Sequence, residues 1–160
     1  MILAFFYNFV FFSIMSIIRI TKEFQFEMAH ALLGYDGPCK NIHGHSYKFD
    51  VTVLGEVKEN TSDSDEGMVV DFGIIKKIVK DLIVDEYDHA LVLNEKMDID
   101  KAQFEFMNKL IIVPFQPTCE LLLVHYAAMI KENLPSNIKL HSLMLRETPT
   151  SYAEWFAADN

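Results

Sequence analysis

Alternation of apolar and polar side chains in two neighbouring segments is the feature that most constrains the fold of this chain. In residues 18–28 and again in 47–53 the two kinds of residue take turns, which is typical of strands with one buried and one exposed face. The residues expected on the buried face are Ile18, Ile20, Phe24, Phe26, Met28, Tyr47, Phe49, Val51 and Val53. The segment 31–42 between them contains glycine and proline and is expected to be a loop. We therefore expect two antiparallel strands joined by this loop.

Three histidines continue the buried phase of these strands at the ends nearest the loop. His30 follows Met28 at a spacing of two residues. His43 and His45 precede Tyr47 in the same phase. Antiparallel pairing brings all three imidazoles to one face of the sheet. Because a catalytic zinc ion usually has three protein ligands and one open position, the pattern predicts a Zn²⁺ site formed by the three histidines.

Other candidate functional groups lie in or beside connections. Cys39, in the loop, is expected to be either a fourth zinc ligand or a reactive base, because a nearby cation lowers the pKa of a thiol. The adjacent Asp88 and His89 are a candidate acid–base pair, since an aspartate can fix the tautomer of an imidazole. Glu147 is either a surface charge or a carboxylate for a guanidine-like ligand edge. The titratable groups expected to be structural are Cys119, His125 and His141.

The remainder of the chain predicts two main helices and two further strands. Asp71 and Thr118 are expected to be helix N-caps, and Pro135 closes the second helix. The expected elements are a helix over 72–84, a short helix at 101–108, a strand-like run at 110–115, a helix over 118–134, and strands over 138–147 and 152–157. The order of the main elements, ββααββ, predicts an α+β fold with a four-stranded antiparallel sheet and both main helices on one face.

Size and composition restrict the domain count, the partners and the compartment. Half of the 160 residues are hydrophobic, which suits one domain, expected over 17–160. A formal net charge of -9 is the wrong sign for neutralising phosphates, so nucleic acid is excluded as a partner. Two cysteines do not form a disulfide scaffold, which favours a reducing cytoplasm. The apolar residues 1–16 are expected to be an extension outside the fold, with a membrane anchor or a docking segment as the alternatives.

Taken together, these motifs resemble the 6-pyruvoyltetrahydropterin synthase and 6-carboxytetrahydropterin synthase family. The resemblance covers roughly residues 18–157. It depends on FEMAH with His30, CKNIHGH with Cys39, His43 and His45, VVDF with Asp71, YDHALVLN with Asp88 and His89, PTCE with Thr118 and Glu120, and RET with Glu147. The joint order of these motifs makes the resemblance specific.

The resemblance implies the tunnelling fold, in which protomer sheets join into a barrel, usually as a homohexamer with active sites between subunits. It implies that the three histidines hold Zn²⁺ and that Cys39, Asp88 and His89 are the catalytic acid–base groups. It implies that Glu147 anchors the pterin, with Thr118 and Glu120 lining the same pocket. The substrate would be a small-molecule pterin triphosphate, and a membrane partner is not expected.

The gap between the cysteine and the HGH motif indicates which reaction is favoured within the family. Three residues separate Cys39 from His43, which resembles the bacterial enzymes of the queuosine pathway. We therefore expect conversion of 7,8-dihydroneopterin triphosphate to 6-carboxy-5,6,7,8-tetrahydropterin, with release of acetaldehyde and triphosphate. The alternatives are 6-pyruvoyltetrahydropterin formation and a non-catalytic, zinc-stabilised pterin-binding oligomer. The apolar leader and the long connection 94–116 depart from the family pattern, and no basic cluster marks a triphosphate site.

Overall fold

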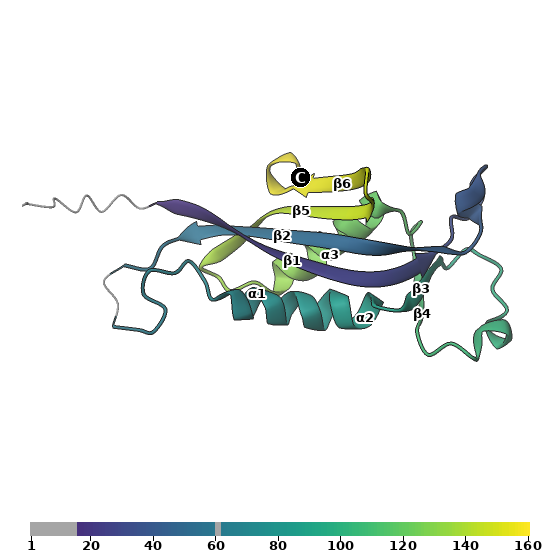
Figure 1. Cartoon of the computed structure of the whole chain (residues 1–160), viewed down its shortest axis with the longest axis horizontal. Coiled ribbons are helices and arrows are strands. Elements are labelled where there is room, and N and C mark those ends of the chain that lie inside the picture. The colour runs from purple at the N-terminus through teal and green to yellow at the C-terminus, as the bar shows by residue number, and fades with distance from the viewer. Residues whose placement is uncertain (1–15, 60–61) are drawn as a thin grey trace, which may run out of the picture.

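Two long, curved, antiparallel strands lie at the centre of the sheet (Figure 1). The computed structural model describes residues 16–59 and 62–160. Strand β1 (Ile17–His30) pairs along its whole length with β2 (His43–Glu56), as the alternation predicts. Burial follows the expected phase where the strands cross the core, because Phe26, Met28, Tyr47 and Phe49 are 0–3% exposed, but Ile18, expected on the buried face, is 44% exposed near the start of β1. Residues 1–15, which make up nearly all of the expected N-terminal extension, lie outside the described residues.

The sheet is larger than the four strands expected. Its order is β4-β3-β1-β2-β5-β6, and β5 (Ile138–Thr148) and β6 (Ser151–Phe156) extend it in antiparallel fashion from β2. The four expected strands are thus confirmed. On the other edge, the short strands β3 (Ala90–Asn94) and β4 (Leu110–Val113) add in parallel orientation beside β1. The connection between them contains a single 3₁₀ turn, Lys101–Phe104, instead of the longer helix expected at 101–108.

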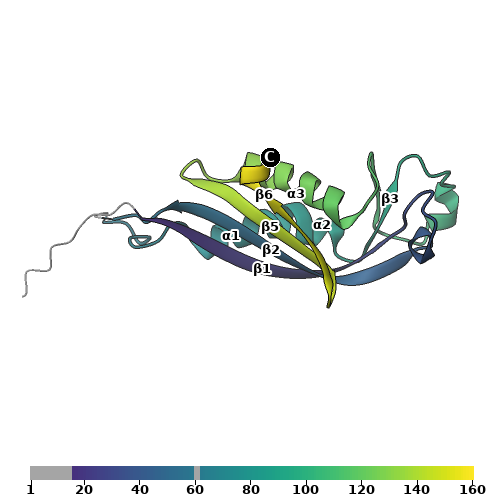
Figure 2. The same cartoon turned by 90° about the horizontal axis from the view of Figure 1, so that it is seen from above.

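The helices lie on one side of the curved sheet (Figure 2). The first helical segment consists of α1 (Phe72–Val79), a π-helical turn (Lys80–Val84) and α2 (Asp85–Tyr87). The second is α3 (Cys119–Asn133). Asp71 accepts the Gly73 N–H at 2.6 Å, and Thr118 accepts the Leu121 N–H at 3.4 Å, so both expected N-caps are confirmed.

The main core lies between the helices and the inward face of β1, β2 and β5. Its centre contains Phe49 and Tyr126, whose rings meet edge to face with centroids 5.5 Å apart. A second, smaller apolar cluster fixes the connection between β3 and β4. Its members are Ala31, Leu91 and Leu93, with Ala29, Met97, Ile99, Phe104, Met107 and Leu110 packed around them. None of the helices within residues 16–59 and 62–160 combines the length and apolar character needed to cross a bilayer.

Candidate metal and pterin site

The three predicted histidines meet at the end of the β1–β2 ribbon. In the strand register His30 faces His43, and Met28 faces His45. The ring centroid of His30 lies 4.5 Å from that of His43 and 5.3 Å from that of His45. One ring nitrogen of each histidine lies within 4.8 Å of the other two. Since β-strand alternation and antiparallel register alone produce this convergence, the sequence-based prediction of the cluster is confirmed.

Hydrogen bonds at Nδ1 orient two of these imidazoles. The Nδ1 of His30 lies 2.6 Å from the carbonyl oxygen of Pro117, and the Nδ1 of His43 lies 2.8 Å from that of Asn41. A carbonyl oxygen accepts only, so in the neutral form of each ring the proton lies on Nδ1 and the lone pair on Nε2. The Nε2 of His30 is buried and has no hydrogen-bond partner among the described residues.

This arrangement fits a Zn²⁺ ion. Burial, and secondarily the neighbouring His43, lowers the pKa of His30, which keeps its imidazole neutral as a metal ligand requires. A buried nitrogen without a partner is costly unless a ligand occupies it. Carbonyl acceptors behind ligating imidazoles are the usual second shell of zinc sites. The donor set, three imidazoles with an open side, therefore suits a catalytic zinc ion better than a hard, oxygen-seeking cation.

A buried tyrosine links the histidines to Glu147. Tyr47 is the next inward residue after His45, and the two ring centroids lie 5.5 Å apart. Its hydroxyl donates to Glu147 Oε1 at 3.0 Å. Burial, reinforced by the negative charge of Glu147, raises the pKa of Tyr47, so the phenol remains a donor. Glu147 and His45 both line a cavity of about 610 Å³, which also includes Lys48 and Arg146. A ligand there would meet the carboxylate and an imidazole together.

The predicted pair Asp88 and His89 is formed immediately after α2. The carboxylate Oδ1 of Asp88 lies 3.0 Å from Nδ1 of His89, and it also accepts the N–H of Glu27 at 2.9 Å. His89 has a φ of 61°, a left-handed conformation that is unusual for a residue with a side chain. Its own N–H donates to the Glu27 carbonyl at 2.6 Å, which holds this conformation. His89 and His45 line a second cavity, of about 330 Å³.

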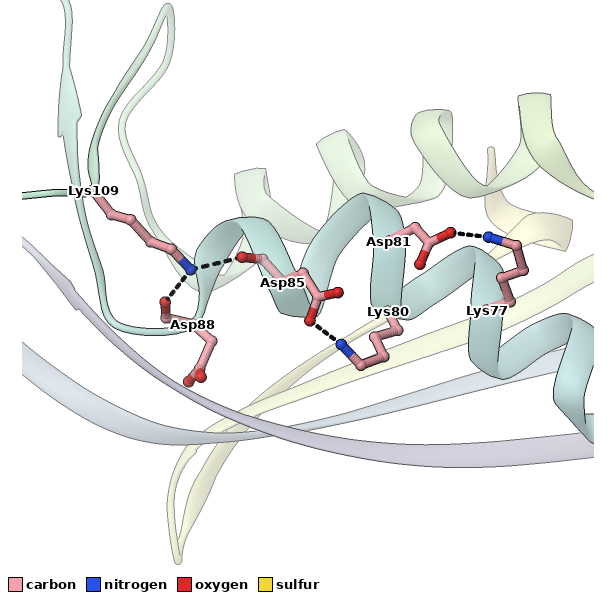
Figure 3. Close-up of polar contacts among 6 residues, drawn as sticks. All are labelled: Lys77, Lys80, Asp81, Asp85, Asp88 and Lys109. Carbon is pink, nitrogen blue, oxygen red and sulfur yellow. Dashed lines mark hydrogen bonds and ion pairs between the residues drawn. The ribbon is translucent and has the colours of Figure 1, made fainter.

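Lys109 anchors the helix end that carries this pair (Figure 3). Its Nζ donates to the carbonyl oxygen of Asp85 at 2.7 Å and to that of Asp88 at 2.8 Å. The Glu27 N–H, the hydrogen bond from His89 and the charge of Lys109 lower the pKa of Asp88, so the carboxylate stays ionised. Nearer the N-terminus of the same helical segment, Figure 3 shows the ion pairs of Lys80 with Asp85 and of Lys77 with Asp81.

Cys39 lies in a 3₁₀ turn (Pro38–Lys40) of the loop between β1 and β2 and is half-buried. Among the described residues, the side chains close enough to share a metal ion are the three histidines without Cys39. Of the two roles expected for Cys39, this arrangement favours a reactive base over a fourth zinc ligand. Cys119, by contrast, is buried and donates to the Leu145 carbonyl at 3.1 Å. Burial raises its pKa to about 12, in keeping with the structural role expected of it.

Neither Thr118 nor Glu120 lines the cavity of about 610 Å³ that contains Glu147. The Thr118 hydroxyl is engaged as the N-cap of α3. Glu120 is exposed and lines a different cavity, of about 300 Å³, together with Glu154 and Trp155.

Sequence reasoning missed several contributors to the site, among them Tyr47, Lys109 and the carbonyls that orient His30 and His43. Tyr47 could have been found, because it follows His45 in the same alternating phase. The carbonyl of Pro117 and the side chain of Lys109 carry no sequence signal, since both act on groups that are distant along the chain. His125 and His141 lie outside the cluster; His125 packs against Phe115, and Arg19 donates to His141 at 2.8 Å.

Comparison with known proteins agrees with this geometry. The family model for 6-pyruvoyl tetrahydropterin synthase matches residues 19–158. The 6-carboxy-5,6,7,8-tetrahydropterin synthase of Haemophilus influenzae is 36% identical over 141 residues, which are 86% of this chain and 97% of that protein. The Synechocystis protein of the same name is 32% identical, over 86% of this chain and 92% of its own length. The solved structure of Caenorhabditis elegans 6-pyruvoyl tetrahydropterin synthase superposes with a TM-score of 0.63 at 27% identity, covering 89% of this chain and 97% of that one.

Proposed function

The chain belongs to the 6-pyruvoyl tetrahydropterin synthase family, and we propose that it is an enzyme that converts 7,8-dihydroneopterin triphosphate and water to 6-carboxy-5,6,7,8-tetrahydropterin, acetaldehyde and triphosphate. This reaction makes it a carbon–carbon lyase. The observation that carries the proposal is the convergence of three imidazoles around the buried, unpartnered Nε2 of His30, next to a cavity that contains Glu147. The names of the curated relatives support the carboxy product over others.

We assign His30, His43 and His45 as the ligands of Zn²⁺. When bound, zinc supplies Lewis acidity toward the oxygens of the substrate side chain, which acidifies the neighbouring C–H bonds. The protein holds the imidazoles ready for this task. The Pro117 and Asn41 carbonyls accept from Nδ1 of His30 and His43, which leaves Nε2 of each ring as the nitrogen that would face a metal.

Proton transfer falls to Cys39 and to the pair Asp88 and His89. In this proposal the Sγ of Cys39 accepts a proton from the substrate side chain. His89 exchanges a proton at Nε2, because its Nδ1 is held by Asp88 Oδ1 at 3.0 Å. An ionised Asp88 stabilises the imidazolium that forms when His89 accepts a proton. The cavity that His89 shares with His45 supports this assignment.

Pterin recognition is assigned to Glu147, Thr118 and Glu120. Tyr47 occupies only part of the hydrogen-bonding capacity of Glu147, so the carboxylate can still pair with the guanidine-like edge of a pterin. Because Glu120 and Glu147 line different cavities of one chain, we propose that a neighbouring protomer completes the pocket. The expected assembly is a homohexamer whose sheets join into a barrel.

The biological setting follows from the product. The three-residue gap between Cys39 and His43 supports a role in queuosine and 7-deazapurine biosynthesis, and the presence of only two cysteines favours a reducing cytoplasm. The second candidate is 6-pyruvoyltetrahydropterin formation, which the likeness to the C. elegans structure favours. A zinc-stabilised binding oligomer without catalysis is the third. Residues 1–16 are assigned as an extension outside the synthase domain of residues 17–160.

One incubation discriminates between these functions. Purified protein is mixed with 7,8-dihydroneopterin triphosphate, and the pterin product, acetaldehyde and bound zinc are measured. Acetaldehyde together with the 6-carboxy product supports the proposal, whereas a pyruvoyl product transfers it to the second candidate. The same incubation is carried out with Cys39→Ala, which removes the proposed proton acceptor. If zinc and assembly persist in the wild type without turnover of any pterin, the enzymatic proposal fails.

A further inference from the structure

The side chain of Gln116 forms a two-point contact with the loop that carries Cys39. Its Oε1 accepts the N–H of Leu33 at 3.1 Å, and its Nε2 donates to the carbonyl of the same residue at 2.8 Å. A carboxamide presents a donor and an acceptor in one plane, as a backbone peptide does. The contact therefore resembles one rung of a strand pairing. It also fixes the orientation of the amide, because the opposite orientation would place donor against donor.

The contact reaches Cys39 in two steps along the backbone. Leu32, the neighbour of Leu33, donates its N–H to the carbonyl oxygen of Cys39 at 3.0 Å. Beyond Leu33 the backbone–backbone hydrogen bonds that the loop makes among the described residues stay within the loop, as from the Tyr35 N–H to the Leu32 carbonyl at 3.4 Å; Tyr35 is exposed, and Gly34 has a φ of 70°. Such a segment opens easily unless its base is held. Gln116 supplies a contact at this base.

Gln116 is itself anchored to the histidine site. The next residue, Pro117, is buried and accepts the Nδ1–H of His30 at 2.6 Å. The N–H of Thr118 donates back to the Gln116 carbonyl at 2.7 Å, and Thr118 begins α3. The start of a 15-residue helix therefore fixes the turn that carries Gln116. One short turn holds both a candidate metal ligand and the loop of the candidate base.

We propose that Gln116 is a positioning residue that holds the 31–42 loop, and with it Cys39, in a fixed place relative to the three histidines. The proposal builds on the function proposed above, because it takes Cys39 as the proton acceptor. Gln116 touches no reacting atom in this scheme. Its removal should affect the loop and the rate of proton transfer, and leave metal binding unchanged.

The first test is Gln116→Met, which keeps the length of the side chain and removes both hydrogen bonds. Two hydrogen bonds correspond to a shift on the order of tenfold to thirtyfold in the opening equilibrium of the loop. We expect amide hydrogen exchange in a peptide spanning 31–42 to accelerate by that factor. We expect kcat to fall about tenfold, with KM and zinc content within twofold of the wild type. Gln103→Met, at an exposed glutamine, is the matched control.

Gln116→Glu is the second variant. An ionised carboxylate faces the Leu33 carbonyl without a proton to donate, whereas a protonated carboxyl reproduces the donor and acceptor of the amide. Exchange in 31–42, corrected for the intrinsic effect of pH, should therefore be fast at pH 8 and return toward the wild-type value at pH 5. If the substitution loosened the loop for a reason other than these two hydrogen bonds, exchange would stay fast at pH 5.

Three outcomes overturn the inference: unchanged exchange in Gln116→Met, accelerated exchange with unchanged kcat, or loss of zinc in parallel with activity. The alkylation rate of Cys39 by iodoacetamide, with buried Cys119 as the internal reference, gives a readout that needs no substrate. At least a threefold change in Gln116→Met is expected. A wild-type protein that converts no pterin overturns the proposed function alone, because exchange and alkylation still decide whether Gln116 holds the loop.

Discussion

Two buried tyrosines that differ in the partner of their hydroxyl group allow a direct test of the polar core under the histidine site. Tyr47 and Tyr126 are both 0% exposed. The hydroxyl of Tyr47 donates to Glu147 at 3.0 Å, whereas that of Tyr126 has no hydrogen-bond partner in the part of the chain that the structure describes. Replacing either by phenylalanine removes one oxygen and keeps the ring. The two substitutions should therefore change the free energy of unfolding in opposite directions.

The expected sizes follow from hydrogen-bond energetics. Tyr47→Phe should lower the free energy of unfolding by about 2 kcal/mol, because a hydrogen bond to a charged group contributes roughly 1.5–3 kcal/mol. Tyr126→Phe should raise it by about 1 kcal/mol, because a buried hydroxyl without a partner costs roughly 1–3 kcal/mol. In a domain of this size 1 kcal/mol shifts Tm by roughly 2–4 °C. The two variants should thus melt about 6–12 °C apart.

Urea unfolding and calorimetry of the wild type and both variants measure this difference. The effect of Tyr47→Phe on function is a second readout: because Glu147 loses a donor that orients it, KM for the pterin should rise more than kcat falls. Destabilisation of similar size in both variants would refute the reasoning, since it would mean that the ring environment and not the hydroxyl partner decides the cost.

Three further predictions concern the histidines and the helix end. In the wild type, zinc at a hundredfold excess over Kd should raise Tm by about 5–10 °C. His30→Ala should abolish both this rise and stoichiometric zinc binding, whereas the control His141→Gln should retain both. Metal analysis and calorimetry measure the two effects. Lys109→Met should reduce stability by about 1 kcal/mol in urea unfolding, because two carbonyls lose a charged donor, and should raise the pKa of Asp88 as followed by carboxyl NMR. Burial lowers the pKa of His125, so just below pH 6.5 the unfolded chain binds more protons than the folded one, and stability falls as the pH drops through that value. Between pH 7 and pH 5.5 the urea midpoint of His125→Phe should therefore fall less than that of the wild type.

Local rules determined a large part of this protein before any contact was known. Alternation with a period of two determined which faces of β1 and β2 are buried, and it placed His30, His43 and His45 on that face. The two N-caps, Asp71 and Thr118, follow equally from side chains that bond to their own helix starts. These features could be predicted because each involves residues close together in sequence or in a continuous strand register.

The tertiary structure decided what depends on pairing between distant segments. The parallel addition of β3 and β4 beside β1 was not visible. The sequence indicated a strand-like run at 110–115, where β4 lies, but β3 is buried throughout and carries no alternation, and neither segment indicates which strand it pairs with. The Tyr47–Glu147 contact spans 100 residues, and the Pro117 carbonyl lies 87 residues from His30. The sequence thus determined which residues are the candidate ligands, whereas the carbonyl acceptors that orient their rings come together only when the ends of the strands and the start of α3 meet.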